Sequence, residues 1–179
     1  MSYVTSGRDL YYLDSCIFLA WLRDEDRPPG EMDGVRELTH RIEKNQISIC
    51  TSAITFTEVI ANKLVASAGT IDMFNSLMQR RSISRIAVDT RVARPARDLR
   101  DHYSVRTDIT PGSKTLSVPD AIHLATALLY KAKKFFTFDR RHKNGSLGLL
   151  PLNGDHGISR LAIEKPVARQ PDLKGINDR

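Results

Sequence analysis

The sequence predicts an α/β protein with helices on both faces of a parallel sheet of roughly five strands, a three-layer α/β/α sandwich. Two observations predict this class. Short apolar segments typical of buried strands alternate along the chain with longer segments of helical spacing, and each parallel connection needs a crossover helix. The chain has 179 residues, of which 41% are hydrophobic, enough for one well-buried domain and few for two. We therefore expect a single domain over residues 1–165 and a C-terminal tail over 166–179.

The first half of the chain supplies three of the expected strands and the helices between them. The strands are short and apolar, at 10–13, 46–50 and 82–88. Helices are expected where apolar residues recur with a helical period or where capping residues precede an apolar segment. They are 16–22 after Ser15, 31–45, a helix capped by Thr51 and Ser52, and 71–81. This half therefore predicts strands that are joined through helices.

The second half continues the same alternation. A helix is expected over 90–103, a polar surface loop over 104–117 and an apolar helix over 118–129. The remaining strands are expected at 134–138 and, at the edge of the sheet, 159–163. Arginines recur at steps of three in the helix over 90–103, which is typical of a solvated helix face and also of a basic surface.

The apolar helix over 118–129, VPDAIHLATALL, carries a single carboxylate at its start. Pro119 fits the first helical position, and Asp120 lies in the first turn, where the helix dipole favours an anion. Apolar residues occupy most of the circumference of this helix, which indicates a buried helix. By itself Asp120 is also consistent with an ordinary first-turn charge, so its role depends on which other acids lie near it.

Four acids stand in apolar contexts where an isolated charge is costly: Asp14, Glu58, Asp120 and Asp139. Asp14 and Asp139 each end an expected strand, and the helix that begins with Asp120 leads into the second of these strands. Ligands of open parallel sheets bind beyond the carboxyl ends of the strands, where the strand order reverses. We therefore expect these acids to face one crevice.

Carboxylates gathered in one crevice repel one another unless a cation neutralises them. Oxygen ligands favour Mg²⁺ or Mn²⁺. Cys16 and Cys50 lie in separate segments with no CxxC spacing, so the sequence supports neither zinc nor a disulfide framework. Divalent ions activate water and stabilise charge on phosphoryl oxygens, which makes phosphodiester hydrolysis the expected reaction.

Charge and hydropathy agree with this expectation. Lys and Arg exceed Asp and Glu by 27 to 21, for a net charge of +6, which is consistent with a polyanionic partner. The sequence has neither a membrane-spanning apolar run nor a signal-peptide core. We therefore expect a cytoplasmic protein with no membrane partner.

Three segments, YYLDSCIFLAW, TSAITFTEVI and SVPDAIHLATALLYKAKKFFTFDRRH, resemble in that order the PIN domain, and especially the VapC-type toxins of bacterial toxin–antitoxin pairs. The match covers most of residues 10–145. The resemblance implies a metal-dependent endoribonuclease with an RNA substrate, a cognate antitoxin partner and a homodimeric state. It also implies a set of catalytic, metal-binding acids and one supporting residue: Asp14, Glu58, Asp120 and Asp139, which bind Mg²⁺ or Mn²⁺, with Thr137 beside them.

The sequence departs from the compact toxins in three places: the loop over 104–117, the segment after Asp139 and the C-terminal tail. Because none of these departures replaces one of the acids, they bear on substrate choice and partner geometry.

A few other residues near the acids have two interpretations each. Arg140 and Arg141 are the best basic candidates for the RNA backbone. His123 is expected to be a packed helix histidine with a satisfied hydrogen bond, and the alternative is that it faces the cleft. His142 fits a phosphate contact and a solvated loop equally well.

Other functions stay open at this point. A PIN-fold RNA-binding or scaffold protein with little catalytic activity retains the acids, and so does a stand-alone RNA-processing nuclease or a DNA-directed nuclease. A phosphatase or receiver domain on a related α/β fold is less well supported, because LDSC lacks the second aspartate of a DxD motif.

Overall fold

The computed structural model describes residues 8–61, 67–104, 115–140, 146–155, 158 and 160–168. Its main sheet has five strands in the order β3-β2-β1-β5-β7, and every pairing is parallel. The strands are β1 (Leu10–Leu13), β2 (Ser48–Ser52), β3 (Ile83–Ile86), β5 (Lys134–Phe136) and β7 (Ala162–Glu164). The predicted fold class is confirmed.

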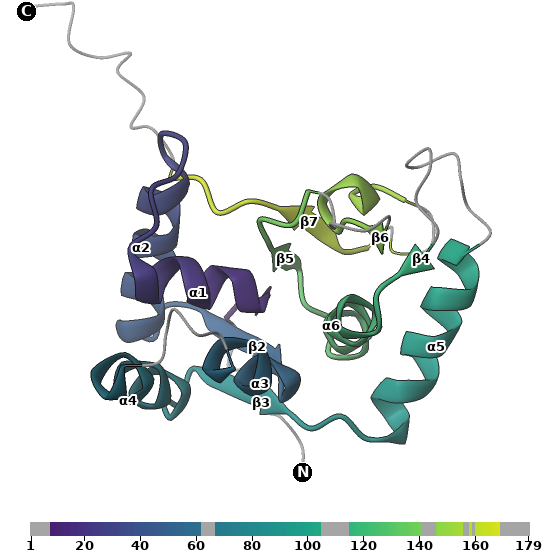
Figure 1. Ribbon diagram of the computed structural model, residues 1–179, viewed down its shortest axis with the longest axis horizontal. Coiled ribbons are helices and arrows are strands. Elements are labelled where there is room, and N and C mark those ends of the chain that lie inside the picture. The colour runs from purple at the N-terminus through teal and green to yellow at the C-terminus, as the bar shows by residue number, and fades with distance from the viewer. Residues whose placement is uncertain are drawn as a thin grey trace, which may run out of the picture.

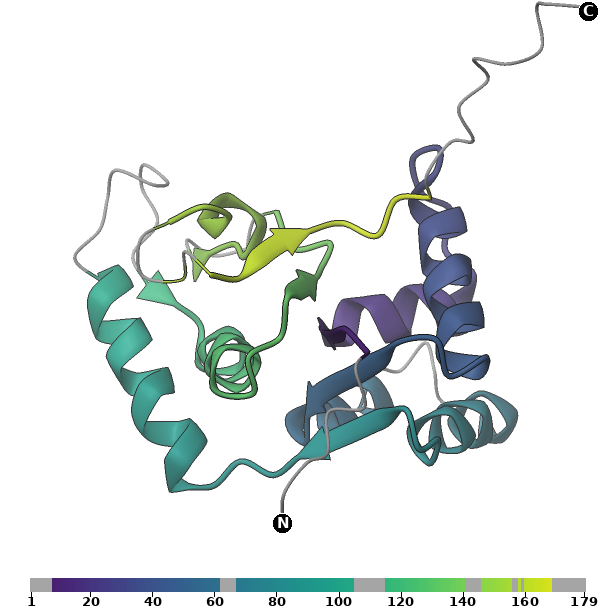
Figure 2. The ribbon, with the colours of Figure 1, turned by 180° about the vertical axis from the view of Figure 1, so that it is seen from behind.

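Helices cover both faces of this sheet (Figures 1 and 2). One side carries α1 (Ser15–Arg23), α2 (Glu31–Glu43), α3 (Ile54–Ile60) and α4 (Ala68–Met78). The other carries α5 (Thr90–Ser104), α6 (Val118–Leu129), the short strands β4 (Thr115–Leu116) and β6 (Ser146–Leu147), and a 3₁₀ turn, η2 (Leu150–Leu152). Within the described ranges, no helix combines the length and the apolar character that crossing a membrane requires.

The alternation of side chains along each strand divides the core into two clusters. Tyr11 and Leu13 pack with α1, α2 and α4, whereas Tyr12 packs with α5 and α6. Tyr12 also stacks on Phe135 of the neighbouring strand, with ring centroids 4.7 Å apart. Both faces of the central strand are therefore buried, as is usual for a parallel sheet.

Two expected helix starts differ in the structure, and the side-chain contacts explain why. Thr51 and Ser52 belong to β2 and the N-cap of α3 is Ala53, although Ser52 Oγ accepts a long hydrogen bond from Ile54 N at 3.4 Å. The Thr51 hydroxyl donates instead to the carbonyl of Leu13, 2.8 Å away on the neighbouring strand. Asp14 and not Ser15 caps α1, because its carboxylate accepts a hydrogen bond from the Ser15 amide.

Several boundaries also differ from expectation. The last strand begins at Ala162 and not at residue 159, because Leu161 N donates to Ile158 O in a turn before it. The helix expected over 71–81 is α4, which begins earlier because Ser67 caps it. Most of the loop expected over 104–117 lies outside the described residues, but Thr115–Leu116 form β4, parallel to β6.

The segment after β7 runs to α2 and packs along it (Figure 1). Ala168 N donates to Gly30 O over 3.2 Å, and Lys165 forms an ion pair with Glu31 at the start of α2. A Cβ atom at Gly34 of α2 would lie 2.4 Å from the carbonyl carbon of Pro166. The first three residues of the expected tail therefore contact the domain, and residues 169–179 lie outside the described part of the chain.

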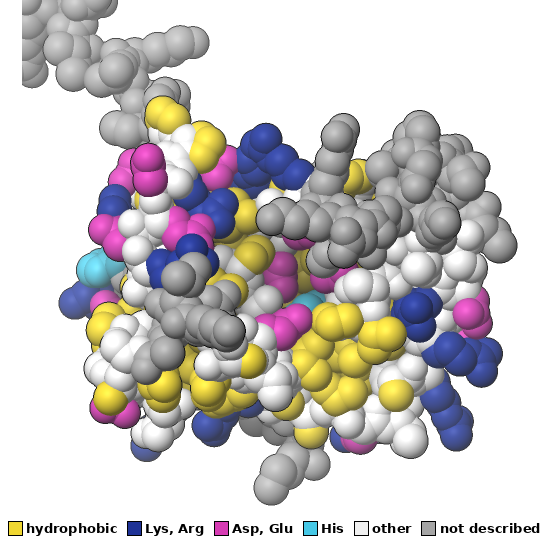
Figure 3. Space-filling model, viewed as in Figure 1, with side chains coloured by type: hydrophobic (Ala, Val, Ile, Leu, Met, Phe, Trp, Pro, Cys, Tyr) yellow, Lys and Arg dark blue, Asp and Glu magenta, His cyan; other side chains and the backbone are white. Residues whose placement is uncertain are grey.

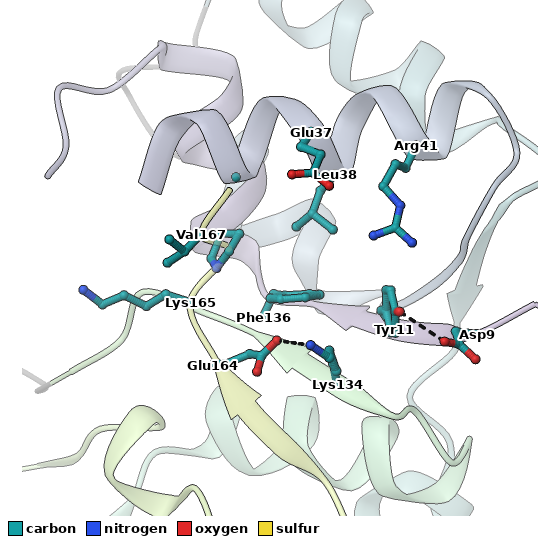
Figure 4. Close-up of a pocket in the computed structure, with 12 residues that line it drawn as sticks. Asp9, Tyr11, Glu37, Leu38, Arg41, Lys134, Phe136, Glu164, Lys165 and Val167 are labelled. Carbon is teal, nitrogen blue, oxygen red and sulfur yellow. Dashed lines mark hydrogen bonds and ion pairs between the residues drawn. The ribbon is translucent and has the colours of Figure 1, made fainter. Parts of the chain in front are cut away.

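This segment borders a pocket of about 500 Å³ between α2 and the strands β1, β5 and β7 (Figure 4). Its walls carry acidic and basic side chains together, with Lys134 paired to Glu164. Basic residues lining it are Arg41, Lys134 and Lys165, and acidic ones are Asp9, Glu37 and Glu164. Because the charges balance, the pocket has no general preference for an anion or a cation.

The contact between Gly34 and Pro166 leads to a stability prediction. Replacing Gly34 with alanine places a methyl group against backbone atoms that do not yield easily, and we expect a loss of about 1–3 kcal/mol in the free energy of unfolding. Denaturant titration followed by circular dichroism measures it. The control is Gly69→Ala in α4, where nothing lies within 4 Å and alanine favours the helix by roughly 0.5–1 kcal/mol. Equal free energies of unfolding for the two variants would contradict the close packing of Gly34 against Pro166.

Candidate active site

The four acids predicted from the sequence lie on elements that meet at one end of the sheet. Asp14 directly follows β1, and Asp139 follows β5, the neighbouring strand on the side where the strand order reverses. Asp120 lies in the first turn of α6, and Glu58 lies on α3. Figure 3 shows acidic side chains and a histidine together in a hollow near the centre of this face.

Asp14 is 5% exposed, and hydrogen-bond donors surround its carboxylate. Oδ1 accepts a hydrogen bond from Ser15 N at 2.7 Å, at the N-terminus of α1, and Oδ2 accepts one from Thr137 Oγ1 at 2.7 Å. Cys16 Sγ lies 3.1 Å from the same Oδ2. These hydrogen bonds give both buried carboxylate oxygens a donor, which offsets much of the cost of burial.

Thr137 joins Asp14 to Asp139. Its hydroxyl donates to Asp14 and accepts a hydrogen bond from Asp139 N at 3.0 Å, and the side chain is fully buried. The Asp139 carboxylate in turn accepts a hydrogen bond from Leu149 N, with Oδ2 2.8 Å away. The Thr137 hydroxyl therefore links the two segments that follow β1 and β5.

Asp120 is held by its own helix cap. Ser117 caps α6: its Oγ accepts a hydrogen bond from Asp120 N at 3.2 Å and donates to Asp120 Oδ2. The helix behind the acid is rigid, because Ala121 and Leu124 are fully buried. Asp120 is 7% exposed, so this carboxylate enters the site from a fixed position.

His123 lies among the acids. Its Nε2 is 2.8 Å from Glu58 Oε2 and 3.7 Å from Asp14 Oδ1, and its Nδ1 is 2.6 Å from the Tyr12 hydroxyl. Burial alone would lower the pKa of His123, but the hydrogen bond to Glu58 and the charges of Asp14, Glu58 and Asp120 outweigh it, so the pKa is raised. The expectation of a packed, hydrogen-bonded histidine is confirmed, and the same ring also contacts the site.

Sequence reasoning missed two members of this cluster, Tyr12 and Cys16. Neither has a local signal, because one lies inside an apolar strand and the other inside an apolar helix. His123 does have one: it follows Asp120 by one helical turn, so both side chains lie on the same face of α6.

The carboxylates at this site are suitable ligands for a hard divalent cation. Among the described residues, no three His, Cys, Asp or Glu side chains form a ready-made metal cluster. Mg²⁺, however, is commonly bound through one or two carboxylates and several waters, and the site gathers carboxylates and hydroxyls beside the His123 ring and the Cys16 thiol. Burial and the neighbouring Asp14 raise the pKa of Cys16 well above its usual value, so the thiol stays neutral and does not offer a soft thiolate ligand.

The two arginines predicted to contact RNA are only partly described. Arg140 is largely exposed, and its guanidinium lies 3.8 Å from Glu31. Arg141 and His142 lie outside the described residues. The role of these side chains stays a prediction.

The arginine stripe on α5 is a solvated face on which two of the four arginines form ion pairs within the described part of the chain. Arg91 pairs with Asp89, and Arg97 pairs with Asp101 one turn away. Arg100 donates from Nε to the carbonyl of Leu116, 3.0 Å away. These contacts favour the simpler of the two interpretations, a solvated helix face.

Fold and site together define an α/β/α protein that places acidic side chains beyond the carboxyl ends of parallel strands. The PIN domain family matches residues 11–146. Because this match spans most of the chain, the protein belongs to the PIN-domain family. No match was found among curated proteins.

Two solved structures are similar in fold to this chain. A toxin–antitoxin complex from Klebsiella pneumoniae has a chain 19% identical, with a TM-score of 0.51, covering 87% of this chain and 97% of its own. VapBC2 from Rickettsia felis, solved bound to a DNA fragment from its promoter, has a chain 16% identical, with a TM-score of 0.54 and the same two coverages, 87% and 97%. At these identities the likeness concerns the fold.

The position of Thr137 leads to a second stability prediction. Thr137→Val keeps the shape but removes the donor to Asp14 and the acceptor for Asp139 N, so we expect a loss of about 1–3 kcal/mol in the free energy of unfolding. Thr137→Ser keeps the hydroxyl and loses one methyl group, at about 1 kcal/mol. Urea unfolding of the two variants, compared with wild type, tests this. A valine variant at least as stable as the serine variant would contradict it.

Proposed function

We propose that this protein is a divalent-metal-dependent endoribonuclease of the VapC type, in which Asp14, Glu58, Asp120 and Asp139 bind Mg²⁺ or Mn²⁺. The observation that carries this proposal is the convergence of buried Asp14 and Asp120 with Glu58 around one histidine, in a chain of the PIN-domain family. Buried acids so close together need a cation, and phosphodiester hydrolysis uses one.

The roles of the residues follow from their contacts. A bound divalent ion supplies an activated water and stabilises negative charge on the phosphoryl oxygens. Asp14 and Asp120, held at helix N-termini, provide fixed carboxylates for it, and Thr137 keeps Asp14 and the Asp139 backbone in register. Arg140, at the exposed start of the segment after Asp139, is available to a phosphate of the RNA backbone.

We further infer the biological setting of a toxin. The solved toxin–antitoxin complex from Klebsiella pneumoniae shares this fold, which supports a cognate antitoxin as a partner of this chain. A net charge of +6 favours a polyanionic substrate such as a nucleic acid, and the choice of RNA rests on the resemblance to VapC-type toxins. A cytoplasmic homodimer, with no membrane partner, is part of the same proposal.

The nuclease proposal is tested by RNA cleavage with Mg²⁺ or Mn²⁺. We expect cleavage to stop with EDTA and to return when the ion is restored. Asp120→Asn should reduce the rate at least about 100-fold, the scale on which one group that stabilises transition-state charge acts. The matched control is Asp98→Asn on α5, whose carboxylate is exposed and pairs with Arg97, and it should cleave like wild type.

Each alternative has its own outcome in this assay. Cleavage that survives both EDTA and Asp120→Asn would refute the metal mechanism. Metal-dependent RNA binding without cleavage would favour the RNA-binding or scaffold protein. Equal cleavage of single-stranded DNA under the same salt would favour a DNA-directed nuclease.

The predicted role of Arg140 is tested by the salt dependence of RNA binding. In the Asp120→Asn background, which keeps the RNA intact, Arg140→Ala should weaken binding and lower the slope of log K against log salt by about 1. Glu31 keeps Lys165 as a partner in this variant. Arg94→Ala, which removes an exposed arginine of α5, is the control and should leave the slope unchanged. Equal slopes for both variants would remove Arg140 from the RNA-binding surface.

A further inference from the structure

We propose that His123 is a positioning residue, which together with Tyr12 holds the Glu58 carboxylate in place at the metal-binding site. The inference rests on the proposed function, because it concerns how the same site is kept in its working geometry. It adds two residues, a tyrosine in the centre of the sheet and a histidine on α6, to the acids.

A continuous line of hydrogen bonds runs from the sheet to Glu58. Ser52 N on β2 donates to the Tyr12 hydroxyl on β1 over 2.9 Å, and this hydroxyl lies 2.6 Å from His123 Nδ1. The opposite ring nitrogen, Nε2, lies 2.8 Å from Glu58 Oε2 on α3. Tyr12 is fully buried and His123 is 1% exposed, so water does not compete for the inner bonds.

The direction of these bonds follows from the donors and acceptors available. A carboxylate accepts only, so Nε2 carries a hydrogen that points at Glu58 whether the ring is neutral or charged. In the neutral ring Nδ1 is then an acceptor, so the Tyr12 hydroxyl donates to it and favours the Nε2–H form that donates to Glu58. In the charged ring both nitrogens donate, and the Tyr12 oxygen accepts from Nδ1 as it does from Ser52 N.

Glu58 depends on this donor more than the other acids depend on any single contact. Its helix, α3, has seven residues and no side-chain cap, and its side chain is 29% exposed. Asp14 and Asp120 are held by backbone amides and hydroxyls of their own segments. For Glu58, the bond from His123 is the one hydrogen bond found among the described residues.

A purely structural role for His123 would predict something different. The ring would then matter through packing, and any variant would affect metal binding only as far as it affects folding. Gln places an amide nitrogen near the position of Nε2 and can donate to Glu58, whereas Leu has a similar volume and donates nothing. The two substitutions therefore separate the hydrogen bond from the packing.

The experiment measures Mn²⁺ affinity of the full chain by calorimetry, with RNA cleavage and thermal unfolding as parallel readouts. We expect His123→Leu to weaken Mn²⁺ binding about 10- to 100-fold, the range found when a group that orients a metal ligand is removed. His123→Gln should restore most of that loss even where its melting temperature is the lower of the two. Tyr12→Phe, which keeps the ring that stacks on Phe135, should weaken binding by a smaller factor.

A double-mutant cycle with Glu58→Gln completes the test. If His123 acts through Glu58, His123→Leu should weaken Mn²⁺ binding little further once Glu58 is replaced. Equal losses in the Gln and Leu variants, or full additivity with Glu58→Gln, would overturn the proposal. Should His123→Leu fail to fold, Tyr12→Phe still decides, because wild-type affinity in that variant would also overturn it.

The test of the positioning role of His123 does not depend on the outcome of the nuclease assay. Wild-type protein that binds Mn²⁺ but does not cleave RNA would refute the proposed function and leave the positioning role to be judged from the affinities. Normal cleavage and normal Mn²⁺ affinity in His123→Leu would refute the positioning role alone.

Discussion

The parallel pairing of β1 with β5 is the interaction on which the site depends. Leu13 lies opposite Phe136 in this register, and Asp14 N continues the ladder by donating to Phe136 O over 3.1 Å. The two strands are far apart in sequence, and the strand order reverses between them, and ligands of open parallel sheets bind beyond the carboxyl ends of the strands at such a point. Their pairing brings the Thr137 hydroxyl within 2.7 Å of Asp14. A slip of one residue would turn Thr137 to the opposite face and separate the acids.

Burying several carboxylates together is costly, and the fold offsets this cost with local donors. Asp14 and Asp120 each lie at a helix N-terminus, where backbone amides and the dipole favour negative charge. Thr137 and Ser117 supply hydroxyls, and His123 supplies a ring N–H near a third acid. These hydrogen bonds hold the carboxylates in place at one end of the sheet. The arrangement suits the proposed binding of a divalent cation.

Much of the fold and the candidate acids of the site could be predicted from the sequence, but the residues that hold those acids could not. Asp14 and Asp139 stand where apolar strands end, and Asp120 follows a proline that starts an apolar helix, so local patterns were enough to select them. Thr51 and Ser52 misled the same reasoning, because a polar pair before an apolar run favours a helix cap when considered locally. In the folded chain the Thr51 hydroxyl bonds to Leu13 of the adjacent strand. The link from Tyr12 through His123 to Glu58 had no comparable signal, since its members lie on three elements separated by up to 111 residues.

By itself, the sequence determined the alternation of strands and helices and the apolar character of α6, and it selected the acids as candidates, because these depend on periodicity and on the cost of an isolated charge in an apolar segment. Only the tertiary structure decided which side chains hold the acids: Thr137 beside Asp14, His123 beside Glu58, and the segment after β7 against Gly34 of α2. Such contacts depend on strand order and register, and hydrogen bonds act over about 3 Å. A difference of one residue in pairing, which local sequence patterns do not specify, would replace every one of these partners.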